Sequence, residues 1–181
     1  MPNLQSLTTV SSTNDKTIAF VSAVEGTSVD GPGLRTSLYF AGCHHRCPGC
    51  HNPETWDVHA GKLVSVEELM ELVRYNDFDV TFSGGDPLYQ AAALFPLAKA
   101  IKEFGKTIWC YTGFTYEEIM EGKHPEMREL LGLIDVVVDG PFIEGRKQSG
   151  LRFRGSDNQR IIDLNETRCC GKVMLWRDGD Y

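Results

Sequence analysis

The chain has 181 residues, of which 41% are hydrophobic and 24% charged, and its formal net charge is −7. This length and composition suit one globular domain that buries a sizeable core. The net negative charge argues against a nucleic-acid-binding surface, because phosphate contacts need a clustered excess of Lys and Arg.

Polar residues fill positions 1–16 without a long periodic pattern, which predicts a loose tail or an added edge element. The remainder, 17–181, is expected to form a single domain. Its apolar patterns predict strands at 17–24, 36–40, 79–83, 107–111, 134–139 and 161–164, and helices at 65–74, 91–104, 116–120 and 126–131.

These strands alternate with helices, and several are nearly continuous apolar runs, which is typical of a parallel sheet covered by helices. The spacing gives about four βα units, too few for a closed eight-stranded barrel. We therefore predict an α/β fold, an open partial (βα) barrel with a mostly parallel sheet.

Six cysteines occur at positions 43, 47, 50, 110, 169 and 170. No signal-peptide pattern opens the chain, and no apolar run approaches the length of a membrane span. We therefore expect a cytoplasmic protein without membrane contact. In that reducing compartment, clustered thiols bind metal more often than they form disulfides.

The loop after the strand at 36–40 carries three of these cysteines, Cys43, Cys47 and Cys50, in the spacing CxxxCxxC. Four thiolates would complete a structural zinc site or an ordinary [4Fe–4S] cluster. Three thiolates leave one iron of such a cluster without a protein ligand, and a small molecule can bind and react at that open position. The spacing therefore favours a cluster with one open iron.

A structural zinc site that uses Cys47 and Cys50 is the alternative. Such a site has four ligands, so it needs two more besides these cysteines. Cys110 lies in the middle of a predicted strand and is expected to be a buried, small apolar side chain. Candidates for the remaining zinc ligands are His44, His45, His51 and the vicinal Cys169 and Cys170, which otherwise are peripheral thiols.

Two glycine-containing turns accompany the cysteine loop. Residues 84–87 (Gly-Gly-Asp-Pro) end a predicted parallel strand, at the edge where ligands bind in such sheets. Their two glycines let the backbone approach a ligand closely. Residues 30–33 (Asp-Gly-Pro-Gly) either form a tight connection or take part in function, and we favour function because they lead directly into the cysteine loop.

The stretch 30–57, from this second turn through the cysteines to Cys-His-Asn-Pro-Glu-Thr-Trp-Asp, resembles the radical S-adenosylmethionine (SAM) superfamily. Within it, the stretch is similar to the branch that activates glycyl-radical enzymes. The resemblance implies a barrel of the radical SAM type and one [4Fe–4S] cluster on the three loop cysteines. An electron from the cluster splits SAM, and the 5′-deoxyadenosyl radical takes a hydrogen atom from a glycine of a partner enzyme. An electron donor such as flavodoxin or ferredoxin is implied, and no catalytic acid or base is expected.

The resemblance also implies site residues. Residues 84–87 are similar to the superfamily's GGE-P motif, which holds the amino group of SAM, with Asp86 where Glu is usual; Gly49 stands where many members have an aromatic residue against the adenine. The residues expected at SAM are Gly49, Cys50, His51, Gly84, Gly85, Asp86 and Pro87, with Thr112 and Asp139 added from their positions at strand ends. The residues expected to hold the partner's glycine loop are Asp30, Gly31, Gly33 and Arg35.

Two activase types share the motifs in residues 29–57, those of pyruvate formate-lyase and of anaerobic ribonucleoside-triphosphate reductase. The short chain and the segments 139–142 and 153–163 resemble the reductase type, so the implied partner is the large catalytic subunit of that reductase. An activase of another glycyl-radical enzyme and a non-catalytic zinc- or cluster-binding module are the alternatives. Arg152, Arg154 and Arg160 are either docking charges for the partner or solvated surface.

Overall fold

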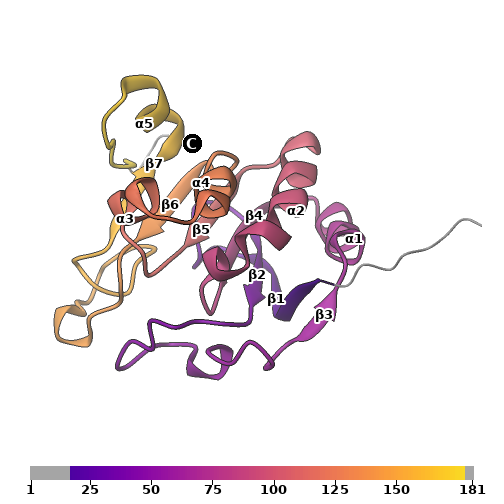
Figure 1. Cartoon of the computed structure of the whole chain (residues 1–181), viewed down its shortest axis with the longest axis horizontal. Coiled ribbons are helices and arrows are strands. Elements are labelled where there is room, and N and C mark those ends of the chain that lie inside the picture. The colour runs from indigo at the N-terminus through magenta and orange to yellow at the C-terminus, as the bar shows by residue number, and fades with distance from the viewer. Residues whose placement is uncertain (1–16, 178–181) are drawn as a thin grey trace, which may run out of the picture.

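The computed structural model describes residues 17–177, so the expected N-terminal tail lies outside the described part (Figure 1). None of the helices in the described range has the length and apolar character that crossing a bilayer requires. The elements are β1 (Ile18–Thr27), β2 (Arg35–Phe40), η1 (Pro53–Thr55), β3 (Lys62–Val64), α1 (Val66–Asn76), β4 (Asp79–Gly84), η2 (Pro87–Gln90), α2 (Ala91–Glu103), β5 (Ile108–Tyr111), α3 (Tyr116–Glu121), α4 (Pro125–Leu131), β6 (Val136–Asp139), η3 (Glu144–Arg146), β7 (Arg160–Asp163) and α5 (Leu164–Cys170).

Every predicted strand and helix is present, with small shifts at the ends, but β3 and α5 were not predicted. The strand β3 has three residues, too few for a periodic pattern, and forms because it pairs with the start of β1, Val64 opposite Ile18. The helix α5 directly follows β7. The Asp163 carboxylate caps it by accepting a hydrogen bond from Glu166 N, and Gly171 ends it with a φ of 68°.

The sheet has seven strands in the order β3-β1-β2-β4-β5-β6-β7. The central strands β2, β4, β5 and β6 are parallel to one another. The pairs β1–β2, β1–β3 and β6–β7 are antiparallel. The fold is thus a mixed α/β fold, and the expectation of a mostly parallel sheet holds only for its centre.

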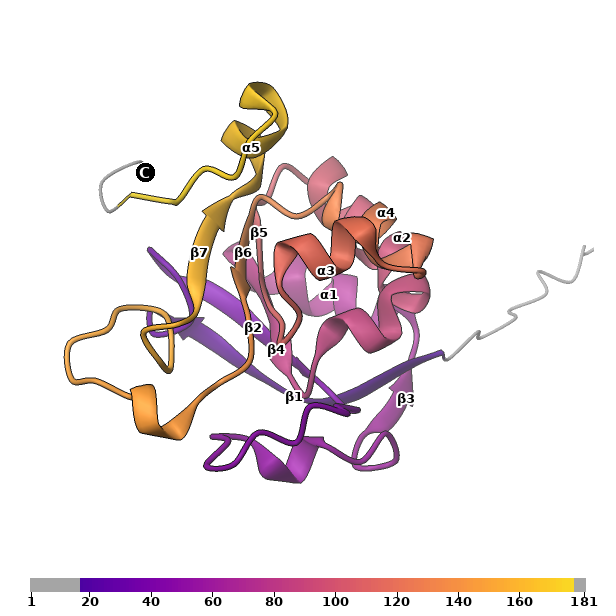
Figure 2. The ribbon, with the colours of Figure 1, turned by 60° about the vertical axis from the view of Figure 1, so that its left-hand side comes forward.

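The main core lies between the helices and one face of this sheet (Figure 2). Alternate residues of the central strands point into it, for example Leu38 and Phe40 of β2, and Phe40 meets the Phe82 ring edge-on at 5.3 Å. The helices α1, α2 and α4 supply Val73, Leu94, Leu130 and their apolar neighbours. This is the amphipathic pattern that the sequence showed.

The opposite face of the sheet carries a smaller apolar cluster around Trp109, Val136 and Val138, which are fully buried. Phe153 and Trp176 cover it, each with its ring edge-on to Trp109. Because side chains alternate along a strand, Tyr111 extends from the same face one step further, toward the carboxyl end of β5. The carboxyl ends of the parallel strands on this face form the site described below.

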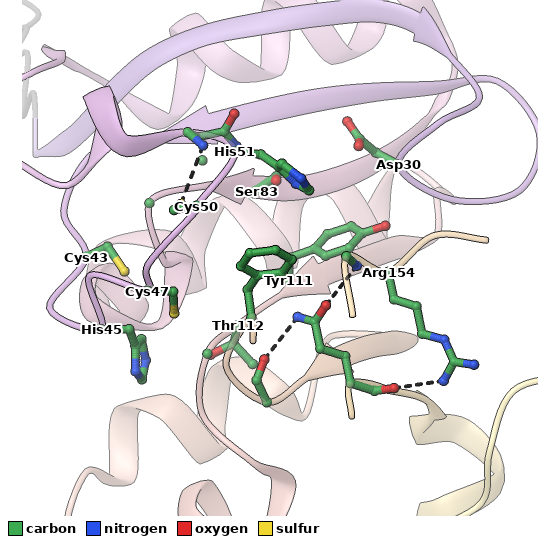
Figure 3. A pocket seen from close by; sticks show the side chains of 18 of the residues that line it. Asp30, Cys43, His45, Cys47, Cys50, His51, Ser83, Tyr111, Thr112 and Arg154 are labelled. Carbon is green, nitrogen blue, oxygen red and sulfur yellow. Dashed lines mark hydrogen bonds between the residues drawn. The ribbon is translucent and has the colours of Figure 1, made fainter. Parts of the chain in front are cut away.

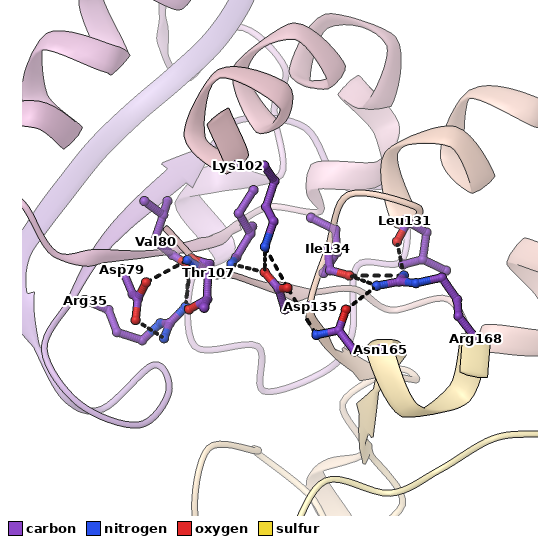
Figure 4. A network of polar contacts seen from close by, with 11 residues as sticks. Arg35, Asp79, Val80, Lys102, Thr107, Leu131, Ile134, Asp135, Asn165 and Arg168 are labelled. Atoms are coloured by element: carbon purple, nitrogen blue, oxygen red, sulfur yellow. Dashed lines mark hydrogen bonds and ion pairs between the residues drawn. The ribbon is translucent and has the colours of Figure 1, made fainter. Parts of the chain in front are cut away.

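A network of polar side chains lies at the amino ends of the parallel strands (Figure 4). Asp135 precedes β6 and binds Lys102 Nζ at 2.6 and 2.7 Å, and it also accepts a hydrogen bond from Ile108 N at 2.7 Å. Asn165 donates to the same carboxylate from α5. Helix α2, strand β5 and helix α5 are thereby joined at one buried carboxylate.

Candidate metal and cofactor site

A cavity of about 400 Å³ opens at the carboxyl ends of the parallel strands (Figure 3). Figure 2 shows the cysteine loop and the loop between β6 and β7 at this same end of the sheet. The lining of the cavity includes ten residues that the sequence singled out as candidates: Asp30, Cys43, His45, Cys47, Cys50, His51, Gly84, Gly85, Thr112 and Arg154. The motifs read separately along the chain therefore face one space.

Backbone hydrogen bonds fix the start of the cysteine loop. Gly42 N donates to Thr55 O at 2.8 Å, and Cys43 N donates to Trp56 O at 3.0 Å, so the two ends of the loop lie side by side. The chain turns sharply inside the loop, where Arg46 and Gly49 have φ values of 47° and 71°. The loop is closed on itself, and all three of its thiols are free.

The three thiols of the loop are the ligand type of an iron–sulfur cluster, whose cysteines bind different irons. Within residues 17–177, no three His, Cys, Asp or Glu side chains converge as the ligands of one metal ion do. Burial raises the pKa of the Cys43 thiol, and the nearby Asp86 carboxylate adds to this shift, whereas hydrogen bonds from the backbone at His45 and Arg46 oppose it.

The Gly84–Gly85 turn packs directly on the strand that leads into the cysteine loop. Gly85 N donates to Phe40 O at 2.8 Å, and Asp86 N donates to Gly42 O at 2.9 Å. A Cβ on Gly84 would lie 2.4 Å from Phe40 N, and one on Gly85 would lie 2.5 Å from Gly42 O. Both glycines are therefore required by close backbone approach, which fixes the turn relative to the cysteines.

The Asp86 carboxylate is occupied by groups of the protein itself. It is 1% exposed, and it accepts hydrogen bonds from Leu88 N, Thr112 Oγ1 and Gly113 N at 2.9–3.0 Å. It lies behind the cavity lining, as does Pro87, which is buried at the start of η2. Its role as a SAM ligand stays a prediction, and its contacts give it a positioning role.

Asp139 is likewise engaged away from the cavity. Its carboxylate accepts hydrogen bonds from Tyr116 N at 2.8 Å and from Arg160 Nη2 at 2.5 Å. Arg160 also binds the Glu117 carboxylate. The expectation that Asp139 lies beside a bound cofactor therefore stays a prediction. Arg160 forms ion pairs with Asp139 and Glu117 and is not simply solvated surface.

The residues expected to hold the partner's loop are divided between the cavity and the interior. Asp30 lines the cavity and accepts a hydrogen bond from Tyr39 OH at 2.6 Å. Gly31 covers the Arg35 side chain, and Gly33 has open space around it. Arg35 itself is 1% exposed, so its side chain lies inside the fold, and its contact with a partner stays a prediction.

The Arg35 guanidinium instead supports the floor of the cavity. Its Nε donates to Thr81 Oγ1 at 2.8 Å, and its Nη2 donates to Val80 O at 2.7 Å. The Thr81 hydroxyl in turn donates to Asp30 O at 2.8 Å. Arg35 therefore positions the loop that carries Asp30.

Sequence reasoning named His45 only as a candidate zinc ligand, and it missed Tyr39 and Tyr111. His45 packs against the Phe114 ring at 4.6 Å, and its Nε2 lies 3.1 Å from Asp86 Oδ2. Tyr39 and Tyr111 also line the cavity, and burial raises the pKa of both phenols. Both tyrosines lie at the carboxyl ends of predicted strands, a position that could have identified them.

The loop between β6 and β7 covers the cysteine loop. A Cβ on Gly49 would lie 2.8 Å from the Glu144 carboxyl carbon, and the His51 ring lies 5.2 Å from the Phe142 ring. Gly49 thus faces this loop instead of the cavity, and its lack of a side chain permits the contact.

Comparison with known proteins agrees with this site. The family model described as a 4Fe-4S single cluster domain matches residues 29–162. The anaerobic ribonucleoside-triphosphate reductase-activating protein of Vibrio cholerae serotype O1 is 36% identical over 143 residues, which cover 74% of this chain and 90% of that protein. The protein of the same name from Escherichia coli K12 is 36% identical over 148 residues, 75% and 92% of the two chains.

Among solved structures, QueE from Escherichia coli matches with a TM-score of 0.45 and 19% identity, over 54% of this chain and 53% of QueE. The sequence relatives, by contrast, align over nearly their whole length, and the family model spans all three loop cysteines. The chain belongs to the family of anaerobic ribonucleoside-triphosphate reductase-activating proteins, which here carries a 4Fe-4S single cluster domain.

Proposed function

We propose that this protein is a radical SAM activase that generates a glycyl radical on the large catalytic subunit of anaerobic (class III) ribonucleotide reductase. The observation that carries the proposal is the joining of Cys43, Cys47 and Cys50 to the Gly84–Gly85 turn around one cavity. Family membership supports the choice of partner. When bound, the cluster supplies one electron to SAM, and the resulting 5′-deoxyadenosyl radical takes a hydrogen atom from the partner's glycine.

The residues of the chain bind the cluster and SAM and position the groups around them. The three cysteines hold the cluster, and the cavity of about 400 Å³ has the size of a small-molecule site. Cys50, His51, Gly84, Gly85 and Thr112 line it and are our candidates for contact with SAM. Asp86, Pro87, Gly49 and Asp139 lie behind this lining, and we assign them the positioning of the turn and strand ends.

The fold suits a macromolecular substrate. The edge strands β3 and β7 stand at opposite ends of the sheet order, which supports an open partial (βα) barrel of the radical SAM type rather than a closed one. Residues 17–181 then form one such domain. A glycine loop of the partner enters the open side past Asp30. Free clustered thiols support action in the reducing cytoplasm, with an electron donor such as flavodoxin or ferredoxin.

Electron paramagnetic resonance (EPR) on anaerobically reconstituted, reduced protein tests the proposal. We expect a [4Fe–4S] signal that changes shape when SAM is added, and a glycyl-radical signal when the reductase subunit is also present. Cys47→Ala is expected to lose the cluster, whereas Cys110→Ala, which removes a buried thiol outside the cavity, is the matched control and retains it. Zinc in place of iron, or a cluster signal indifferent to SAM, would contradict the proposal. A glycyl radical formed only on a pyruvate formate-lyase would reassign the partner.

A further inference from the structure

A second cavity, of about 350 Å³, lies beside the first, between the loop at 150–154, the start of β7 and the segment at 174–176. We call it the arginine groove, after the cations in its lining. Figure 2 shows the segment after α5 passing beside β7. The lining of the groove includes Leu151, Arg152, Arg154, Arg160, Leu175 and Trp176.

The groove concentrates positive charge in a chain whose net charge is −7. Asp139 and Glu117 balance Arg160. Arg154, by contrast, donates through Nη1 to a neutral backbone carbonyl, Gln159 O, at 2.8 Å, and forms no ion pair with any carboxylate in residues 17–177. A guanidinium has five N–H donors in a fork that fits a carboxylate, so most of the donors of Arg154 remain for a ligand.

The other wall of the groove is apolar. Leu175 is 55% exposed, and it is held there because its segment pairs with β7, with Trp176 N donating to Ile161 O at 2.9 Å. An exposed leucine beside a tryptophan and a row of arginines suits a peptide that carries a carboxylate next to an apolar side chain.

The arginine groove is continuous with the cluster cavity, because Leu151 and Arg154 line both. A polypeptide that inserts a glycine into the cluster cavity must continue across its rim, and these two residues lead it into the groove. An extended chain advances about 3.3 Å per residue, so a few residues beside the glycine reach across.

We propose that the arginine groove binds an acidic, apolar-containing stretch of the reductase subunit next to its target glycine. The inference rests on the proposed function and names the chemistry of the partner's contact. The carboxylate pairs with Arg154, and the apolar side chain packs on Leu175. The cysteine site and the groove then hold the two parts of one substrate segment.

The test measures the dissociation constant between the reconstituted activase with SAM and the catalytic subunit of the reductase, by biolayer interferometry. Arg152→Glu and Leu175→Asp place negative charge in the groove, and Lys172→Glu makes the same charge change as Arg152→Glu on an exposed cation outside it. We expect each groove variant to weaken binding about tenfold or more, and the control to bind like the wild type. Circular dichroism and iron content verify that each variant folds and carries its cluster.

Equal binding by Arg152→Glu and Lys172→Glu would overturn the groove proposal. Deletion of the acidic residues 178–181 (Asp-Gly-Asp-Tyr) tests a competing occupant, the chain's own C-terminus. We expect the deletion to leave binding unchanged or tighter. A loss as large as that of Arg152→Glu would assign the groove to this segment and overturn the proposal. SAM cleavage by wild-type protein with dithionite, without the partner, is measured separately, because its absence contradicts the proposed function and not the groove.

Discussion

Thr112 donates its hydroxyl hydrogen to the Asp86 carboxylate at 2.9 Å and so joins the carboxyl end of β5 to that of β4. The same carboxylate oxygen accepts from Gly113 N, and the other accepts from Leu88 N. In the motif that resembles a cofactor-binding sequence, the carboxylate thus binds groups of the protein itself. Its two glycines, and not its carboxylate, face the cavity.

We predict that Asp86→Ala lowers the free energy of unfolding by roughly 3 kcal/mol, because it leaves buried donors without an acceptor. Thr112→Val removes one hydrogen bond to a charged group and is expected to cost about 1.5–3 kcal/mol. Urea unfolding measures both. Asp86→Asn is expected to keep SAM affinity, measured by calorimetry. An Asp86→Asn protein of unchanged stability that fails to bind SAM would show that the carboxylate contacts the cofactor.

Gly85→Ala is predicted to separate the turn from the cysteine loop. The new Cβ would meet Gly42 O at 2.5 Å, a backbone atom that cannot move without shifting Cys43. We expect a loss of about 1–3 kcal/mol of stability and less bound iron per chain after reconstitution. Gly145→Ala is the matched control, since nothing lies within 4 Å of its added Cβ. Equal iron contents in the two variants would refute the coupling.

Arg35→Lys is predicted to destabilise the fold by roughly 2 kcal/mol or more, because a lysine cannot reproduce the forked hydrogen bonds to Thr81 and Val80. The exchange keeps the charge, so a purely electrostatic role would be preserved. Thermal unfolding gives the stability, and biolayer interferometry gives the affinity for the reductase subunit. A stable Arg35→Lys protein that no longer binds the subunit would support Arg35 as a partner contact.

We predict that Glu117 makes a pH-dependent contribution to the free energy of unfolding. Its hydrogen bonds with Arg160 lower the pKa of its carboxyl below the ordinary 4.5. A pKa lowered by folding stabilises the protein above the unfolded value, and this stabilisation disappears as the pH falls through the folded value. The Glu117 side chain is 51% exposed, so the gain is expected to be less than about 1 kcal/mol. Urea unfolding of wild type and Glu117→Gln should differ at pH 7 and converge below pH 4; a constant difference would contradict the assignment.

The sequence predicted what depends on local pattern. The central strands follow from apolar runs, α1 from its Ser65–Glu68 capping box, and the meeting of the cysteine loop with the Gly84–Gly85 turn from the rule that parallel strands place their carboxyl ends at one edge. These features need only neighbours along the chain or the general geometry of a parallel sheet.

The sequence did not predict which charged side chains pair across the fold. Arg35 was expected at the partner-binding surface because of the motif that it belongs to, yet Thr81 and Val80, more than forty positions away, hold it inside. Asp139 looked like a rim carboxylate until β7 brought Arg160 to it. Such contacts between distant residues are set by strand order, which no local pattern encodes.

The Asp135 network and the cysteine loop lie at opposite ends of the parallel strands, so the two ends of the sheet have different roles. One end anchors helices, and the other end presents ligands. Substitutions near Asp135 can therefore change the stability of the protein without altering its ligand binding. The loops at the carboxyl ends of the strands can vary while the sheet and its helices stay constant. A designer who wished to retarget this scaffold to another polypeptide would leave Asp135 and its partners alone and rewrite the rim.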